Sequence, residues 1–266
     1  ELWGPFIAGI KEYRLIQPGD RVCVCISGGK DSMLLAKLMQ MLQKRSDFPF
    51  EVRYLVMDPG YTPANRQKIV DNAALLDIPA EVRQSAIFAS VEHVEKNPCY
   101  LCARMRRGHL YNQAKLLGCN KISLGHHLND VIETTVMAMF YSSKLETIIP
   151  KCHSENFEGM ELIRPMYRIK EQDILNWCRY NGLEFIQCAC RFTEGISKRE
   201  VSSKRKEAKN LIAELKKTHP DVDDNVFRSI HAGQLESFPG YKADGELRSF
   251  LDDYEEMEER RKNRKS

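Results

Sequence analysis

Short apolar runs in this chain alternate with longer segments in which apolar residues recur every three to four positions. The short runs predict strands at 21–26, 51–57, 81–84 and 121–125. The longer segments predict helices at 33–42, from Thr62-Pro63 onward, and near 102–117, where Gly118 ends the pattern. Strands and helices that alternate in this way are typical of βαβ units. The pattern therefore predicts an α/β fold in which helices flank a parallel sheet.

Further segments extend this pattern at both ends of the chain. Residues 1–18 are amphipathic and predict a short N-terminal helix. Beyond residue 150 the pattern predicts a strand at 162–164, a helix near 170–181 and a strand at 184–186. From Ser197 the composition becomes highly charged. We therefore divide the chain into an N-terminal helix (1–18), a core domain (19–195) and a charged, helical C-terminal extension (196–266).

The C-terminal extension contains two charged segments. Residues 198–217 carry eight Lys or Arg against three Glu, with apolar residues at helical spacing, and predict a helix with a basic face. From Leu251 to Ser266 an acidic run precedes a basic run, an order that suits the dipole of a helix. This tail is either a solvated helix or a frayed end, or it contacts RNA.

The composition restricts the class of protein. The chain has 266 residues, of which 42% are hydrophobic, enough for a sizeable core. It has no run of 18 apolar residues and no signal-peptide pattern, so we expect a cytoplasmic protein without a membrane partner. The net charge of +3 is compatible with binding to nucleic acid but does not require it.

The chain contains nine cysteines, an odd number that favours reduced thiols or metal ligands over a disulfide framework. For five of them a small buried side chain is the simplest interpretation: Cys23, Cys25, Cys119, Cys152 and Cys178. The other four form two close pairs, Cys99 with Cys102 and Cys188 with Cys190.

The two cysteine pairs have a spacing suited to a metal site or to redox chemistry. We expect Cys99 and Cys102 to lie in a tight turn after Pro98, and Cys188 and Cys190 to follow a strand of the same sheet. The two pairs then meet, and hold a zinc ion or an iron–sulfur cluster, or form a redox dithiol. Three cysteines on a four-iron cluster leave one iron open, as a catalytic cluster requires.

The first predicted strand runs into the segment Ser27-Gly28-Gly29-Lys30-Asp31-Ser32, directly before a predicted helix. Adjacent glycines permit a sharp turn, and the N-terminus of a helix directs N–H groups towards an anion. The segment therefore predicts a phosphate site to which Lys30 adds a positive charge. The spacing differs from that of a Walker A loop, and Asp31 indicates a bound Mg²⁺ or a charged catalytic role.

Two further loops follow strands of the predicted sheet. Asp58 ends the second strand, and Gly125, His126, His127 and Asp130 follow the strand at 121–125. Because parallel strands end at one edge of a sheet, we expect these loops to converge with 27–32 on one crevice.

The loop after the strand at 121–125 offers several roles. We expect Asn129 or Asp130 to cap the next helix, and His126 and His127 to point in different directions. Asp130 also has the position to share a Mg²⁺ with Asp31 or to orient an attacking group, although capping alone explains it equally well.

Three arginines follow the first cysteine pair: Arg104, Arg106 and Arg107. Guanidinium groups bind phosphate through paired hydrogen bonds. We interpret this concentration as a site for the phosphates of a nucleic acid or for the polyphosphate of ATP.

Four motifs, in order, resemble those of one family: S-G-G-K-D-S, C-Y-L-C-A-R-M-R-R-G, L-G-H-H-L-N-D and I-Q-C-A-C. The first resembles the PP-loop of the N-type ATP pyrophosphatases. The combination, over roughly residues 15–195, resembles the tRNA 2-thiocytidine synthetase (TtcA) family. Two positions depart from the family pattern, because its late Cys-x-x-Cys is here Cys188-Ala189-Cys190 and its Asp-Asp pair is here Asn129-Asp130.

The resemblance implies a PP-loop ATPase fold of the Rossmann-like, HUP type and an ATP-dependent tRNA sulfurtransferase that forms AMP and pyrophosphate. Such an enzyme adenylates C2 of the cytidine at position 32 in the anticodon loop and replaces its oxygen with sulfur. The cofactors implied are ATP, Mg²⁺ and a [4Fe-4S] cluster. The partners are tRNA and a sulfur donor, either a cysteine desulfurase or sulfide, and a homodimer is also compatible.

The resemblance also assigns roles by position. The catalytic residues implied are Lys30, Asp31 and Asp130, of which Asp31 and Asp130 also hold Mg²⁺. The cluster ligands implied are Cys99, Cys102 and either Cys188, which we favour, or Cys190. The residues implied to bind ATP are Ser27, Gly28, Gly29, Lys30, Asp31, Ser32, Asp58, Gly125 and His126, and those implied to bind RNA are Arg104, Arg106 and Arg107.

The sequence leaves three alternatives open. In the first, the enzyme thiolates another tRNA base or a small molecule. In the second, a persulfide and a disulfide formed between the cysteine pairs replace the cluster. In the third, the chain is a zinc-stapled RNA-binding protein without catalysis.

Overall fold

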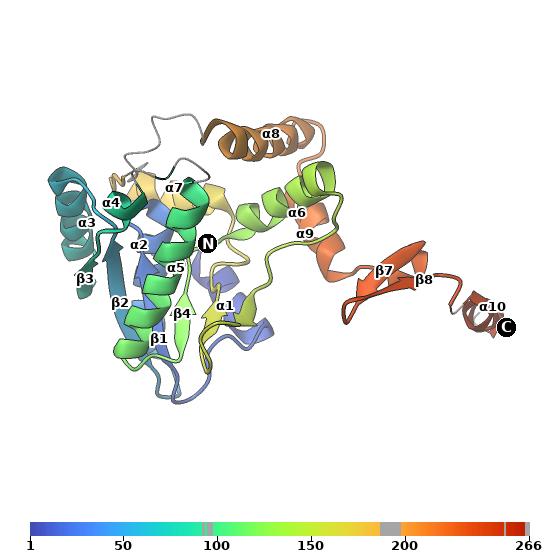
Figure 1. The fold of residues 1–266 in the computed structure, drawn as a ribbon, viewed down its shortest axis with the longest axis horizontal. Coiled ribbons are helices and arrows are strands. Elements are labelled where there is room, and N and C mark those ends of the chain that lie inside the picture. The colour runs from blue at the N-terminus through green and yellow to red at the C-terminus, as the bar shows by residue number, and fades with distance from the viewer. Residues whose placement is uncertain (92–93, 95–97, 187–197, 253, 264–266) are drawn as a thin grey trace. The chain divides into compact units, whose positions relative to one another are not determined.

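The computed structural model describes residues 1–91, 94, 98–186, 198–252 and 254–263. They form two compact units, Glu1–Pro220 and Asp221–Ser266, which we describe separately. The first unit contains the central sheet and the loops that follow its strands (Figure 1).

A six-stranded sheet forms the centre of the first unit, with the strand order β3-β2-β1-β4-β6-β5. The strands are β1 (Arg21–Ile26), β2 (Glu51–Asp58), β3 (Ala80–Gln84), β4 (Lys121–Ser123), β5 (Lys151–His153) and β6 (Glu161–Ile163). Every neighbouring pair is parallel except β5 with β6, which is antiparallel. The predicted α/β fold with a parallel sheet is confirmed.

Helices also belong to the first unit, some between consecutive strands and others before or after the strands of the sheet. They are α1 (Trp3–Glu12), α2 (Lys30–Arg45), α3 (Pro63–Leu75), α4 (Ile87–Val91), α5 (Pro98–Leu116), α6 (Leu128–Ser142), α7 (Glu171–Tyr180) and α8 (Lys198–Lys216). The side chain of Thr62 accepts a hydrogen bond from the Asn65 N–H and caps α3, as its sequence predicts. None of the described helices is long and apolar enough to cross a membrane.

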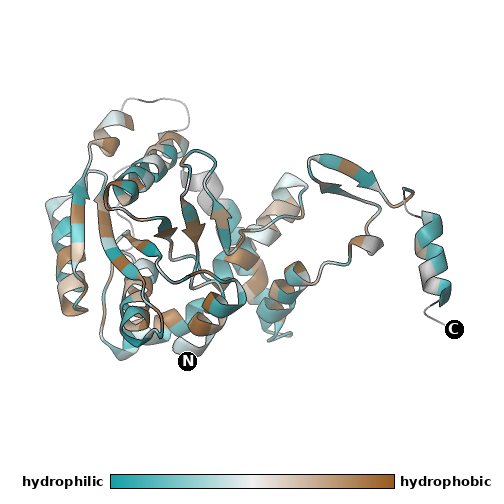
Figure 2. Cartoon of the chain, turned by 90° about the horizontal axis from the view of Figure 1, so that it is seen from below, coloured by the Kyte–Doolittle hydropathy of each residue, from teal (hydrophilic) through white to brown (hydrophobic). Residues whose placement is uncertain are grey.

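The central strand β1 is buried on both faces. Val22, Val24 and Ile26 pack into the core beneath α2, whereas Cys23 and Cys25 pack on the opposite face with Tyr111 and Ala114 of α5. Figure 1 shows α5 lying in front of the sheet, and Figure 2 shows hydrophobic residues concentrated in the central strands. A strand covered by helices on both sides explains the unbroken apolar run at 21–26.

The predicted strand at 184–186 is wrong, because these residues form no ladder with the sheet. Their contacts are with helices instead: Phe185 stacks on Trp177 of α7, and the Glu184 carbonyl accepts a hydrogen bond from Asn72 of α3 (2.9 Å). Apolar residues at strand spacing therefore pack against helices here. The pairs Cys188 and Cys190, predicted to follow this strand, lie outside the described residues.

Several other boundaries differ from their predictions. Helix α5 begins at Pro98, so Cys99 and Cys102 lie in its first turns and not in a separate tight turn. The edge strand β5, which contains Cys152, was not predicted, because it is too short to give a clear period-two pattern. Helix α1 ends at Glu12 because Arg14 turns the chain with a positive φ of 48° and directs the buried Leu15 into the core.

The second unit contains α9 (Val222–His231), the 3-10 turn η2 (Leu235–Ser237), the antiparallel hairpin β7 (Gly240–Ala243) with β8 (Glu246–Ser249), and α10 (Tyr254–Asn263). Asp244 and Gly245 join the two strands, both with positive φ, as a tight hairpin turn requires. The hairpin was not predicted, because a short, polar strand pair resembles a loop. Helix α10 corresponds to the predicted charged tail, and Figure 2 shows that its residues are largely hydrophilic.

Candidate active site

The loop between β1 and α2 is shaped by the hydroxyl group of Ser32. This group accepts a hydrogen bond from the Ser27 N–H (3.1 Å) and donates one to the Gly29 carbonyl (2.9 Å). Gly29, directly before α2, has an extended backbone and provides no side-chain cap for the helix. The N–H groups in the first turn of α2 therefore face the loop, where the positive end of the helix dipole favours an anion.

The position of Gly28 imposes two requirements, one on the backbone conformation and one on space, that only glycine meets. Its φ of +86° lies in the left-handed region. A Cβ atom at this position would also lie 2.5 Å from Cγ1 of Ile69 on α3. The loop is thus fixed against α3 at Gly28 and remains open at Gly29, where the nearest such contact is the Ser27 hydroxyl at 3.8 Å.

The ammonium group of Lys30 lies between two carboxylates. Its Nζ is 2.9 Å from Oδ1 of Asp31 and 3.3 Å from Oε1 of Glu171, the first residue of α7. Burial works to lower the pKa of Lys30, but the charges of Asp31 and Glu171 outweigh it and raise that pKa. Lys30 is therefore a cation at neutral pH and is held at the N-terminus of α2.

The loop after β4 lies directly against the start of α2. A Cβ atom at Gly125 would lie 3.1 Å from the carbonyl carbon and oxygen of Asp31 and 3.2 Å from the Ser32 nitrogen. The loop and the helix approach this closely only because residue 125 has no side chain. Two of the three loops that we expected to converge on one crevice are thus in contact.

His127 lies between the two carboxylates that the sequence predicts to share a Mg²⁺. Its Nε2 is 3.7 Å from Oδ1 of Asp31 and 3.5 Å from Oδ2 of Asp130. Among the described side chains, no group of three His, Cys, Asp or Glu residues is arranged as a metal site. A metal ion here would therefore need ligands from elsewhere, such as phosphate oxygens.

The cap of α6 differs from its prediction. The helix begins at Leu128 with His127 as its N-cap, and Asp130 accepts a hydrogen bond from the His127 N–H (3.0 Å). Asn129 caps a different helix, since its Oδ1 accepts a hydrogen bond from the N–H of Glu171 at the start of α7 (2.9 Å). The side chain of Asn129 therefore ties the start of α6 to the start of α7, where Glu171 contacts Lys30.

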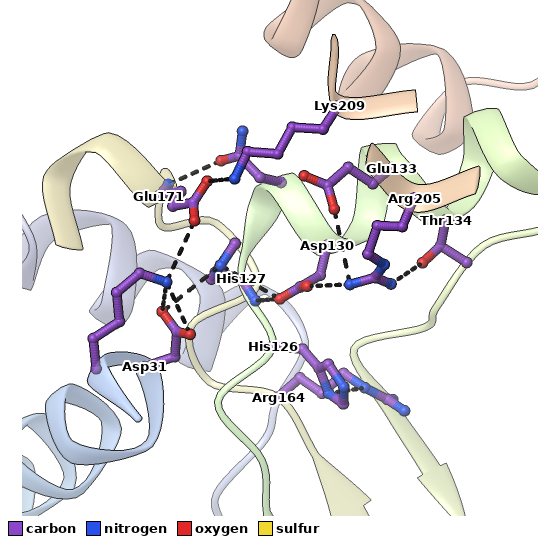
Figure 3. A network of polar contacts seen from close by, with 12 residues as sticks. Asp31, His126, His127, Asp130, Glu133, Thr134, Arg164, Glu171, Arg205 and Lys209 are labelled. Carbon is purple, nitrogen blue, oxygen red and sulfur yellow. Dashed lines mark hydrogen bonds and ion pairs between the residues drawn. The ribbon is translucent and has the colours of Figure 1, made fainter. Parts of the chain in front are cut away.

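Helix α8 contributes two cations that the sequence did not assign to the site (Figure 3). Arg205 Nη1 lies 2.9 Å from Oδ1 of Asp130, and Lys209 Nζ lies 2.6 Å from Oε2 of Glu171. The Arg205 and Lys209 positions, four residues apart, lie on one face of the helix. The only signal in the sequence was the basic composition of this helix, which is equally typical of a solvated surface.

Three acidic side chains beside α8 differ in their protonation behaviour. Burial raises the pKa of Glu133 to about 7, against the opposing effect of Arg205 and Lys209. Burial also acts to raise the pKa of Asp130, but His127 and Arg205 outweigh it and lower that pKa. The pKa of Glu171 is likewise lowered, because Lys209 and Lys30 overcome the effect of burial.

His126 points away from this network, as predicted for adjacent histidines (Figure 3). Its Nδ1 accepts a hydrogen bond from Nε of Arg164, 3.2 Å away, in the turn after β6. Arg164 is buried, with 8% of its surface exposed. No signal in the sequence marks Arg164, because this residue is far from the motif in the chain and reaches the loop through the β4–β6 pairing.

Asp58, predicted to bind ATP, is fully buried at the end of β2. Its Oδ1 accepts hydrogen bonds from the N–H groups of Gly60 (2.8 Å) and Tyr61 (2.6 Å), and its Oδ2 accepts one from Nε of Arg66 (2.6 Å). The carboxylate therefore fixes the loop after β2. A contribution to nucleotide binding stays a prediction.

The cysteine and arginine positions on α5 are described only in part. Cys102 is buried with 8% of its surface exposed, while the side chain of Cys99 lies outside the described residues. Arg104 and Arg107 are exposed and Arg106 is half-buried. Their roles as cluster ligands and RNA contacts stay predictions.

Comparisons with known proteins agree with this geometry. Residues 7–192 match the PP-loop domain family. A tRNA-cytidine(32) 2-sulfurtransferase of Polaromonas sp. is 32% identical over 225 residues, which are 83% of this chain and 70% of that protein. The protein of the same name from Bordetella pertussis is 34% identical over 228 residues, 83% of this chain and 68% of its own length.

A solved structure shares the fold. The U34-tRNA thiolase NcsA from Methanococcus maripaludis, solved with its [4Fe-4S] cluster, superposes with a TM-score of 0.67 at 20% sequence identity. The match covers 86% of this chain and 76% of that one. The sheet, the PP-loop at the start of α2 and the similarity along most of the sequence together show that the chain belongs to the PP-loop family of tRNA-cytidine(32) 2-sulfurtransferases.

Proposed function

We propose that this protein is an ATP-dependent tRNA sulfurtransferase that replaces the C2 oxygen of the cytidine at position 32 with sulfur. The observation that carries the proposal is the position of Lys30 at the uncapped N-terminus of α2, in contact with the loop after β4, in a chain of this family. The relatives named for this reaction share about a third of their residues with the chain over most of its length.

The phosphates of ATP bind at the N-terminus of α2 in this proposal. The backbone N–H groups of the first helical turn and the ammonium group of Lys30 supply positive charge there. Carboxylates and phosphate oxygens are the usual ligands of Mg²⁺ at such sites. Asp31 and Asp130 therefore fit a magnesium ion that also binds the phosphates.

The chain's own residues act on the charge that develops during adenylation. The C2 oxygen of the base attacks the α-phosphate, and pyrophosphate leaves. Lys30 and the N–H groups of the loop stabilise the negative charge of that leaving group. The carboxylates around Lys30 keep it charged and in place before ATP binds. AMP then leaves from C2 when sulfur is added.

The cysteines of α5 fit an iron–sulfur cluster in their spacing. Cys99 and Cys102 are three residues apart on a helix and so lie on one face of its first turns. A third ligand from Cys188 or Cys190 would complete the set. When bound, a cluster with three cysteine ligands supplies a coordination position for the sulfur that is transferred.

The arginines at 104, 106 and 107 provide the contact to tRNA in this proposal. They lie on the first half of α5, next to the cysteines. A plot of the logarithm of the tRNA binding constant against the logarithm of the salt concentration has a negative slope, because each phosphate contact releases counterions. Replacing all three arginines with Gln makes this slope shallower by about two to three. The exposed Arg179 on α7 provides a matched control whose replacement leaves the slope unchanged.

The test of the reaction uses anaerobic protein, ATP, sulfide and an unmodified tRNA transcript. We expect 2-thiocytidine, AMP and pyrophosphate in equal amounts with a transcript that carries cytidine at position 32. A matched transcript with uridine there remains unmodified. Thiolation of another base, or pyrophosphate release without any thiolated product, contradicts the proposal.

The cofactor is tested separately by its absorption and its metal content. We expect a broad visible band and about four irons per chain. Cys99→Ala abolishes both, whereas Cys178→Ala, at a buried cysteine of α7, preserves them. Colourless protein with zinc, or with neither metal, contradicts the cluster. Separate Cys188→Ala and Cys190→Ala variants identify the third ligand by their loss of iron.

The partners follow from the same reaction. The sulfur comes from a cysteine desulfurase or from sulfide, and the reaction takes place in the cytoplasm. A homodimer is tested by the mass of the protein in solution, with and without tRNA.

A further inference from the structure

Arg164 and His126 form a hydrogen bond whose chemistry permits only one arrangement of protons. The donor is Nε of Arg164 and the acceptor is Nδ1 of His126, 3.2 Å apart. A guanidinium group carries N–H donors and no acceptor. Nδ1 must therefore present its lone pair, and the single proton of the imidazole lies on Nε2.

We propose that Arg164 is a positioning residue that holds His126 as a neutral imidazole, so that its Nε2–H donates a hydrogen bond to a phosphate oxygen of the bound nucleotide. The proposal rests on the proposed function for the identity of the ligand, but not for the state of the histidine. It assigns to His126 neither general-base catalysis nor metal binding, since Nδ1 is occupied and Nε2 is protonated.

The position of Arg164 makes the arrangement stable. The residue is buried, and it lies in the turn after β6, where its N–H donates to the Pro150 carbonyl (2.9 Å). Nη1 of its guanidinium group donates to the carbonyl of Ile149. Among the described residues, no carboxylate forms an ion pair with Arg164. Its positive charge is therefore not neutralised by a carboxylate, and it acts on His126.

The surroundings of His126 favour the neutral state from several sides. Burial and the charge of Arg164 lower the pKa of His126, and Arg205 on α8 and His127 act in the same direction. Asp130 on α6 opposes them. The neutral state thus follows both from the hydrogen bond and from the balance of charge.

The location of His126 explains what the donor would contact. It follows Gly125, whose backbone touches Asp31 and Ser32 in the phosphate loop. Within the described part of the chain no group accepts a hydrogen bond from Nε2 of His126. A neutral N–H at this place suits an oxygen that gains negative charge, because it stabilises the oxygen without a proton being lost.

The first test reads the proton position directly, without any substrate. The full-length protein is labelled with ¹⁵N at histidine, and the two ring nitrogens of His126 are assigned with the His126→Gln variant. At pH 7 we expect the ¹⁵N chemical shifts of a neutral ring with its proton on Nε2, both in the wild type and in Arg164→Lys, which retains a donor. Arg164→Leu shifts the ring towards the other tautomer or the protonated form. A wild-type ring that is protonated on Nδ1 overturns the proposal.

The second test uses His126 itself and does not depend on how Arg164 variants fold. The amide of Gln places an N–H near the position of Nε2, whereas the amide of Asn reaches only the position of Nδ1. We expect His126→Asn to lower ATP-dependent pyrophosphate release by about a hundredfold and His126→Gln by only about tenfold. Equal losses in both variants contradict the donor role.

The outcomes separate this inference from the proposed function. The predicted tautomer in a protein that binds ATP but thiolates no tRNA supports the inference and contradicts the proposed reaction. Thiolation of cytidine 32 by a protein whose His126 carries its proton on Nδ1 supports the proposed reaction and contradicts the inference about His126.

Discussion

The backbone of Gly125 lies against the backbone of Asp31, at a distance that leaves no room for a side chain. A Cβ atom at position 125 would lie 3.1 Å from the Asp31 carbonyl oxygen, and backbone atoms on both sides would have to move. This contact joins the loop after β4 to the phosphate loop. The geometry of Lys30, His127 and Asp130 depends on it.

Gly125→Ala is therefore expected to impair the site more than the fold. Separation of the two loops by a few tenths of an ångström lowers kcat/KM for pyrophosphate release by about tenfold, because catalytic groups lose alignment. Gly4→Ala, in α1, is the control, since no heavy atom lies within 4 Å of its Cβ position. We expect that variant to match the wild type in activity and to be more stable by about 0.5–1 kcal/mol. Equal activity of both variants would contradict the role of the contact.

Lys30→Met is expected to reduce ATP-dependent pyrophosphate release by about a hundredfold to a thousandfold, as loss of a donor to a developing charge does. Binding of tRNA remains, because Lys30 faces Asp31 and Glu171 within the site. Lys44→Met, in the last turn of the same helix, changes neither property. The measurements are pyrophosphate release and tRNA affinity at one salt concentration. A parallel loss of tRNA binding would show that Lys30 acts on the RNA instead.

The phosphate loop could be predicted because all of its signals are local. The apolar strand, the adjacent glycines and the helix that follows lie within about one strand and one helix of each other in the sequence. The same holds for the loop at Gly125, which follows a strand of the same sheet. Parallel strands then bring these two loops together, as we expected.

The partners of these loops could not be predicted, because they arrive by tertiary packing. Arg205 and Lys209 belong to a helix whose charges resemble those of any solvated surface, and Arg164 depends on the pairing of β4 with β6. The segment at 184–186 has the composition of a strand, yet its apolar side chains pack on helices. Local pattern alone does not distinguish these outcomes.

Lys121→Met is expected to destabilise the protein by about 3–5 kcal/mol, because it leaves two buried carboxylates without their partner. Lys121 Nζ lies 2.9 Å from both Asp20 and Glu161 and also donates to the Leu15 carbonyl. The measurement is the free energy of unfolding in urea.

Lys151→Met is the control for this cluster. Lys151 is only half-buried and its Nζ lies 3.9 Å from Oε1 of the same Glu161, so its loss costs less than about 1 kcal/mol. If both substitutions lowered the free energy of unfolding by similar amounts at neutral pH, burial of the ion pairs of Lys121 would make no difference to their contribution to stability.

Glu133→Gln is expected to make stability less dependent on pH. Burial raises the pKa of Glu133 from 4.5 to about 7, so between these values the folded protein holds more protons than the unfolded chain. The stability that Glu133 contributes is fully present below pH 4.5 and is lost as pH rises through 7. The free energy of unfolding of the variant, relative to that of the wild type, therefore increases between pH 5 and 8 by up to about 3 kcal/mol.

Glu171→Gln provides the matched control with the opposite sign. The pKa of Glu171 is lowered, since Lys209 and Lys30 overcome the effect of burial. Its contribution to stability is present above its ordinary pKa and is lost as pH falls through the lowered value. Glu171→Gln therefore has a lower free energy of unfolding than the wild type, and this difference becomes smaller towards acidic pH. The free energy of unfolding of Glu133→Gln, in contrast, increases relative to the wild type towards alkaline pH. Urea unfolding at several pH values measures both, and a pH-independent difference for Glu133→Gln would mean that its carboxylate titrates normally in the folded protein.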